Sequence, residues 1–143
     1  MFKKMVQPLA FVVILCASTT TLAEDAYHQD VKVDRILQTS VDSAGHRIEY
    51  PQSGTQEVTG VVVNIPAGAS TGWHVHTVPC VAYVEQGTVT IQREDGSAKT
   101  VVAGQAFAEV VNLNHNGTNT GSVPARIILF AIGTQGTPVA VKR

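Results

Sequence analysis

The segment GASTGWHVHTVPC, residues 68–80, decides how this chain folds, because it places two histidines at alternate positions. Side chains on a β-strand alternate between two faces, so His74 and His76 would point to the same side of a strand. His115 follows in NLNHNGTN, residues 112–119. Imidazole is the commonest side-chain ligand of mid-row divalent metals. If His115 lies on a neighbouring strand, the three histidines predict a site for one metal ion with open coordination positions.

The sequence around this segment has the alternation and the turn signals of short β-strands. Residues 57–65 (EVTGVVVNI) are rich in β-branched side chains and are expected to form a buried strand. Asp95-Gly96 predicts a hairpin turn. Further strands are expected at residues 31–37, 47–50, 81–85, 88–93, 107–111 and 126–132, with a turn at residues 40–46. Turn signals recur about every 8–12 residues without a helical period, which indicates an all-β sandwich or barrel.

The N-terminal residues have the layout of a secretory signal peptide. Lys3 and Lys4 precede a short apolar stretch at residues 9–17, and small residues at 21–23 offer a cleavage site. The apolar stretch is too short to span a bilayer. We therefore expect a signal peptide at residues 1–23 and a single domain at residues 24–143. The mature protein would be secreted or periplasmic and not held in a membrane.

Charge and cysteine content limit the partners and the sources of stability. Residues 24–143 contain eight basic and 11 acidic side chains, a net charge of −3, without a basic stripe that could bind nucleic acid. Cys80 is the single cysteine of this segment, so no internal disulfide can form. The core, a metal or an oligomer must then stabilise the fold. A homodimer is expected, because a small barrel has sheet edges to cover.

The spacing of glycines around the histidines is more specific than the histidines alone. It resembles the two signatures of the cupin superfamily, G-x5-H-x-H-x3/4-E-x6-G and G-x5-P-x-G-x2-H-x3-N. The first signature is matched by Gly68, His74, His76 and Gly87, and the second by Gly104, His115 and Asn119. Val110 and Asn112 occupy the proline and second-glycine positions of the second signature, and Cys80 occupies the glutamate position of the first.

The resemblance implies a double-stranded β-helix, or jelly-roll barrel, with a metal inside its mouth. By this resemblance His74, His76 and His115 would be metal ligands. The ion would be one divalent transition metal: Fe, Mn, Zn, Ni or Cu. The usual fourth ligand, a glutamate, is absent at its signature position, where this chain has Cys80.

Cys80 allows two interpretations. It could be a thiolate ligand or a redox-active thiol beside the metal, since a metal can hold a coordinating thiol deprotonated. It could instead be a small buried residue that leaves a three-histidine site, because free cysteines are often buried and inert. Cysteine at this position also resembles the thiol dioxygenases, which are three-histidine iron members of the superfamily.

Glu109 is the second candidate for a catalytic role beside Cys80. It lies in the strand expected at residues 107–111, directly before the Val110 position of the second signature, and could be a carboxylate near the metal that orients water or acts as a base. The competing interpretation, a solvated charge on a strand, is the more common state of an isolated glutamate.

These observations predict an exported cupin with one metal ion that acts on a small-molecule substrate. The reaction could be an oxygenation, an isomerisation or a lyase step, and the fold alone does not choose among them. The alternative is a periplasmic cupin that binds a small molecule or a metal without chemistry. A metal that only stabilises the barrel is a third interpretation.

Overall fold

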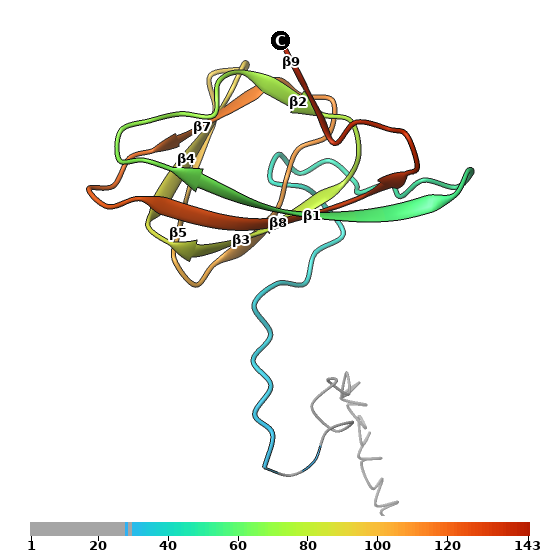
Figure 1. Ribbon diagram of the computed structural model, residues 1–143, viewed down its shortest axis with the longest axis horizontal. Coiled ribbons are helices and arrows are strands. Elements are labelled where there is room, and N and C mark those ends of the chain that lie inside the picture. Colours follow the sequence, from blue (N-terminus) through green and yellow to red (C-terminus); the bar gives the residue numbers. More distant parts are fainter. Residues whose placement is uncertain (1–27, 29) are drawn as a thin grey trace, which may run out of the picture. The chain divides into compact units, whose positions relative to one another are not determined.

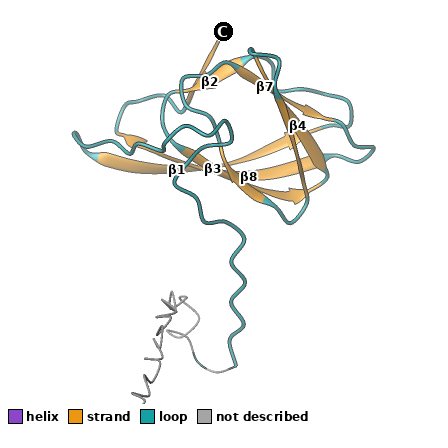
Figure 2. Cartoon of the chain, turned by 180° about the vertical axis from the view of Figure 1, so that it is seen from behind, coloured by secondary structure: helices purple, strands orange, loops and turns teal. Residues whose placement is uncertain are grey.

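The strands of the chain belong to two antiparallel sheets (Figures 1 and 2). The structure, a computed structural model, describes His28 and residues 30–143, so the expected signal peptide lies outside the described residues. All nine strands lie in the compact unit Arg35–Arg143. Within the described residues there is no helix, and none could therefore span a membrane.

The first sheet has four strands and the second has five. In spatial order, the first contains β1 (Gln56–Ile65), β8 (Ala125–Thr134), β3 (Cys80–Gln86) and β6 (Ala106–Ala108). The second contains β5 (Ala98–Val102), β4 (Thr88–Arg93), β7 (His115–Asn119), β2 (His74–His76) and β9 (Ala140–Lys142). Buried side chains from both sheets form one apolar cluster, so the sheets enclose a common core. The expected all-β jelly-roll fold is confirmed.

Most of the expected strands are present, but three expectations were wrong. Residues 31–37 and 47–50 form no strand; an isolated bridge between Val41 and Arg47 closes a turn there. The Asp42 carboxylate accepts hydrogen bonds from the backbone N–H groups of Ala44 and His46, so side-chain turn chemistry organises this segment. The third error concerns β1, which was expected to be buried. It is an edge strand, and the Val58 side chain on its outer face is 65% exposed.

Two residues of the cupin-like signatures, Gly87 and Asn119, stabilise the fold. Gly87 has a φ of 81°, and a Cβ there would lie 2.8 Å from the Cα of Ala125, so only glycine fits the turn between β3 and β4. Asn119 is fully buried. Its side-chain amide donates hydrogen bonds to the carbonyls of Ile65 and Val123, at 2.9 and 2.8 Å. Asn119 thereby ties the end of β7 to the end of β1 and to the turn before β8.

Strand pairing sets the positions of the histidines. In the register of β2 and β7, His74 lies directly opposite His115. The other edge of β2 pairs with β9, where His76 lies opposite Ala140. The C-terminal strand β9 was not predicted, yet it holds the strand that carries two of the three histidines.

Candidate metal centre

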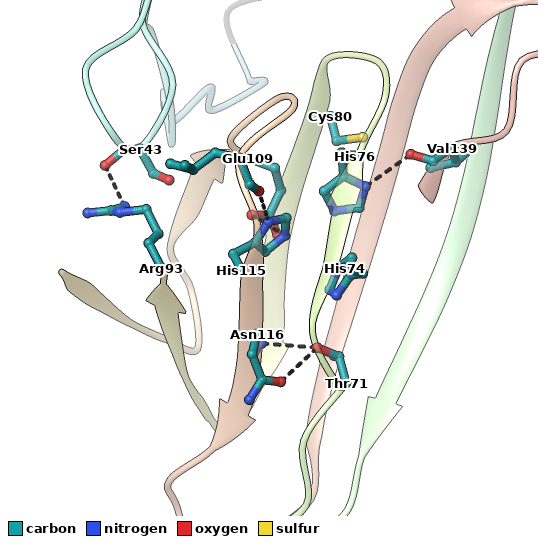
Figure 3. Close-up of polar contacts among 12 residues, drawn as sticks. Ser43, Thr71, His74, His76, Cys80, Arg93, Glu109, His115, Asn116 and Val139 are labelled. Atoms are coloured by element: carbon teal, nitrogen blue, oxygen red, sulfur yellow. Dashed lines mark hydrogen bonds and ion pairs between the residues drawn. The ribbon is translucent and has the colours of Figure 1, made fainter. Parts of the chain in front are cut away.

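The three histidines predicted to bind a metal lie together at one end of the barrel. One side-chain nitrogen from each of His74, His76 and His115 lies within 4.8 Å of the others, and the rings point toward one another (Figure 3). Two nitrogens bound to one ion at about 2.1 Å lie at most about 4.2 Å apart. Small side-chain rotations would therefore bring all three nitrogens to one ion.

Backbone carbonyls orient each of the three rings. The Nδ1 atoms of His74, His76 and His115 lie 2.8, 3.2 and 2.9 Å from the carbonyl oxygens of Gly72, Val139 and Leu113. A carbonyl oxygen can only accept a hydrogen bond, so each Nδ1 carries the proton and each Nε2 has a free lone pair. Fixing the tautomer of a ligand through its second nitrogen is the usual outer-shell arrangement of metal-binding histidines.

Burial keeps the imidazoles of His76 and His115 neutral, as metal ligands must be. Burial, followed by the neighbouring His115, lowers the pKa of His76 to about 4. Burial is also the main cause that lowers the pKa of His115. The Nε2 atom of His115 is buried and has no hydrogen-bond partner within the described part of the chain. A buried lone pair without a partner is costly, and a metal ion would satisfy it.

Glu109 lies beside this cluster, in the connection that follows β6. Its side chain is 9% exposed, so the interpretation as a solvated strand charge is wrong. Its Oε2 atom lies 4.0 Å from Nε2 of His115 (Figure 3), and among the described residues this oxygen also has no hydrogen-bond partner. Burial raises the pKa of Glu109 to about 7, against a smaller opposing effect of Lys99. A carboxyl group with this pKa can both accept and return a proton near neutral pH.

Comparison with known proteins agrees with this geometry. The Cupin domain family matches residues 61–131, the stretch that carries all three histidines and Glu109. The chain belongs to the cupin superfamily. Among curated proteins, none matches the sequence significantly.

Several solved cupin structures share the fold. An oxalate oxidase in complex with glycolate is 21% identical over 59% of this chain, with a TM-score of 0.51. The DMSP lyase DddQ from Ruegeria pomeroyi DSS-3 is 20% identical over 59% of this chain, also with a TM-score of 0.51. The matched regions span 45% and 42% of those two chains. A cupin domain from Bordetella pertussis Tohama I is 19% identical over 61% of this chain and 99% of its own length, with a TM-score of 0.50.

Cys80, at the glutamate position of the first cupin signature, does not join the histidine cluster. It is 1% exposed, and its thiol donates a hydrogen bond to the carbonyl of Val78 at 3.3 Å. Burial, and secondarily Glu109, raises the pKa of the Cys80 thiol to about 12. A neutral, hydrogen-bonded thiol favours the interpretation of Cys80 as a small buried residue. The roles of Cys80 and Glu109 in ligation and catalysis stay predictions.

Sequence reasoning missed the contribution of the C-terminal residues to this cupin site. The carbonyl of Val139 accepts hydrogen bonds from the Nδ1 atom of His76 and from the backbone N–H of Thr77, each at 3.2 Å. The acceptor is a backbone atom in the segment after Gly136, so no side-chain motif marks it. The signal that could have found it is the alternation in PVAVK at residues 138–142.

A cavity opens next to the three histidines. Its other walls come mainly from apolar side chains: Val63, Ile65, Val89, Ile91, Phe107, Ile127 and Leu129, with Thr71 and Gly117 at the edge. Glu109 is its acidic group, and it also borders a second cavity that is lined by Cys80 and by residues 46–50. The site thus combines three imidazole rings, one carboxyl group and an apolar wall.

Proposed function

We propose that this protein is an exported metalloenzyme of the cupin superfamily that catalyses proton transfer on a small molecule, as an isomerase or lyase. The observation that supports this choice is the buried Glu109 carboxyl group, which lies 4.0 Å from Nε2 of His115 without another partner among the described residues. Isomerisation and elimination both require a group that accepts a proton from carbon and returns it. Export is inferred from the leader at residues 1–23.

The histidines, Glu109 and the apolar walls have separate roles in this proposal. The Nε2 atoms of His74, His76 and His115 would hold one divalent transition metal ion. When bound, the ion would act as a Lewis acid that polarises a substrate oxygen. Glu109 would take a proton from the adjacent carbon and return it at another position or to the leaving group. The apolar walls would exclude water, which strengthens these electrostatic interactions.

The test uses solvent deuterium exchange, because exchange reports proton transfer at carbon whatever the final product is. Purified protein is stripped with a chelator, reloaded separately with Fe, Mn, Zn, Ni or Cu, and incubated in D2O with a panel of small carbonyl and hydroxy acids. NMR then detects carbon-bound deuterium. We expect metal-dependent exchange that falls by about 100-fold or more in Glu109→Gln, the usual effect of losing a general base. The exposed Glu85→Gln is the matched control.

The proposal fails if exchange survives in the His74→Ala/His76→Ala double variant or is unchanged in Glu109→Gln. A non-catalytic cupin that binds a small molecule or a metal is the alternative function. One observation favours it: among the described residues that line the cavity, Glu109 is the one ionisable group other than the histidines. Recovery of bound ligand unchanged after long incubation, without deuterium incorporation, would support this alternative.

A further inference from the structure

His74 differs from the other two candidate ligands in how firmly its surroundings hold it. It is half-buried, whereas His76 and His115 are buried. Its Nδ1 atom lies 2.8 Å from the carbonyl oxygen of Gly72, in a contact that is open to solvent. Water can compete for such a hydrogen bond. The placement of the Gly72 carbonyl therefore decides how well the ring of His74 is oriented.

The chain reaches His74 through a β-bulge. Ser70 lies opposite Thr118 of β7, and His74 lies opposite His115 of the same strand. Four residue steps lead from Ser70 to His74, but three lead from Thr118 to His115, so the segment before β2 contains one extra residue. Gly72 lies in this segment and has a φ of 78°, the left-handed conformation that glycine adopts easily in bulges.

The bulge allows Thr71 and His74 to face the same cavity. Residues that are three positions apart point to opposite faces of a regular strand. Both side chains nevertheless line the histidine cavity, because the extra residue shifts the alternation by one position. Bulges next to functional sites commonly redirect a side chain in this way.

Thr71 holds the bulge against β7. Its backbone N–H donates a hydrogen bond to the carbonyl of Gly117 at 2.9 Å, and its Oγ1 atom accepts one from the backbone N–H of Gly117 at 3.0 Å. The same Oγ1 lies 3.1 Å from the Gly72 carbonyl and 3.4 Å from Oδ1 of Asn116 (Figure 3). The hydroxyl has one proton to donate, and the Gly72 carbonyl is the nearer acceptor. Thr71 and His74 thus contact the same carbonyl oxygen, which has two lone pairs.

We propose that Thr71 is a positioning residue for the metal centre, which holds the Gly72 bulge on β7 and thereby orients the imidazole of His74. The proposal rests on the metal-binding role of the histidines in the proposed function. Thr71 acts through the Gly72 carbonyl, which keeps the proton of His74 on Nδ1 and leaves the lone pair of Nε2 free for the ion.

The orientation of His74 can be measured without a metal. In chelated protein at about pH 8, above the reference pKa of histidine, nitrogen NMR distinguishes the two neutral tautomers of an imidazole. We expect the wild type to carry the His74 proton on Nδ1. Thr71→Val keeps the shape of the side chain but removes the hydroxyl, so it should give a mixture of both tautomers. Thr71→Ser keeps the hydroxyl and should resemble the wild type.

Metal affinity gives a second measurement. Chelator competition with cobalt-loaded protein should show an affinity about tenfold lower in Thr71→Val, at the lower end of the usual effect of losing an outer-shell partner. Thr71→Ser should stay within about threefold of the wild type. Thr90→Val is the matched control, because it removes a hydroxyl that contacts Thr100 and Thr120 on the outer face of the same sheet. It should change neither the tautomer of His74 nor the affinity.

The bulge itself offers a second pair of variants in case Thr71→Val does not fold. A Cβ at Gly72 meets no atom within 4 Å, so a substitution there acts through the backbone conformation. Gly72→Val strongly disfavours the left-handed conformation, whereas asparagine tolerates it. Gly72→Val should therefore mix the tautomers of His74 and weaken cobalt binding more than Gly72→Asn does.

The outcomes separate this proposal from the proposed function. A His74 tautomer that is unchanged in Thr71→Val and Gly72→Val, or effects of the same size in Thr90→Val, overturn the positioning role while the metal centre stands. A wild-type protein that does not retain cobalt, or in which His76→Ala retains it equally well, overturns the metal centre of the proposed function. The tautomers in the metal-free protein show in either case whether Thr71 orients His74.

Discussion

Cys80 is the residue at which this chain departs from the cupin signature, and its neutral buried thiol leads to a prediction. Because the thiol lies outside the histidine cluster and has a pKa of about 12, Cys80→Ala should change metal affinity by less than about threefold. His76→Ala should lower it by at least about 100-fold, since it removes a ligand. Competition with a chelator, followed by elemental analysis, measures both. A sulfur-to-metal charge-transfer band in the copper-loaded protein that Cys80→Ala abolishes would contradict the prediction.

Glu109 makes the stability of the metal-free protein depend on pH. Its pKa is raised from 4.5 to about 7 in the folded state, so the ionised form is disfavoured there. The resulting loss of stability is absent below about pH 4.5, grows as the pH rises, and is complete above about pH 7. Between about pH 4.5 and pH 8 the free energy of unfolding should fall relative to Glu109→Gln by up to about 3 kcal/mol. Urea denaturation of the chelated proteins measures this, and a difference that does not vary with pH would refute it.

The sequence predicted the positions of the three histidines better than the environment of Glu109. The histidines could be predicted because strand alternation and the cupin spacing both constrain them. The burial of Glu109 could not, since it depends on which side chains from β1, β4 and β8 close over it. The same holds for the Nδ1 hydrogen bonds, whose acceptors are backbone carbonyls.

Removal of the short strand β9 is predicted to weaken metal binding. Truncation after Thr137 removes the carbonyl of Val139 that orients His76, and also the pairing of β9 with β2. Loss of such an outer-shell partner typically weakens metal binding by about 10–100-fold. Truncation after Ala140 keeps the Val139 carbonyl and should therefore weaken metal binding less than truncation after Thr137. Chelator competition measures both truncated proteins, and equal metal affinities would show that β9 does not orient His76.

Strands whose own residues carry a strong pattern were predicted, and strands that depend on a partner were not. β1, β4 and β8 have β-branched or alternating apolar residues, and β4 is followed by Asp95-Gly96. The segments 31–37 and 47–50 show weaker alternation and find no partner strand among the described residues. The three-residue strand β9 exists because β2 offers it an edge. The alternation in PVAVK at residues 138–142 is its local signal, and that stretch is too short to predict a strand without the partner.

At the level of the whole molecule, export remains a proposal with a direct test. If residues 1–23 form a signal peptide, the protein expressed with its full sequence in a secreting bacterial host will begin at Glu24. Intact-mass spectrometry of the periplasmic or medium fraction gives the new N-terminus. Replacement of Lys3 and Lys4 by glutamate should leave the precursor uncleaved in the cytoplasm. Recovery of the uncleaved chain outside the cytoplasm would contradict cleavage at this position.

The outer face of the four-stranded sheet is apolar, although its inner face already packs on the core. Side chains on this outer face include Val58, Val62 and Phe130, which are 65%, 47% and 51% exposed. Strands that are apolar on both faces are typical of sheets covered on both sides. Beside this face, β1 offers a ten-residue edge that pairs with no other strand of the described chain.

We propose that a second copy of the chain covers this face in a homodimer. Face-to-face packing of the two four-stranded sheets around a two-fold axis would bury both outer apolar faces in one interface. Analytical ultracentrifugation should give a dimer mass for the wild type and a monomer mass for Val62→Lys/Phe130→Lys. Val102→Lys, a substitution at an exposed valine on β5 of the other sheet, should remain dimeric. A monomeric wild-type protein at micromolar concentration would exclude this interface, because an obligate contact of about 800 Å² per subunit or more is expected to persist under those conditions.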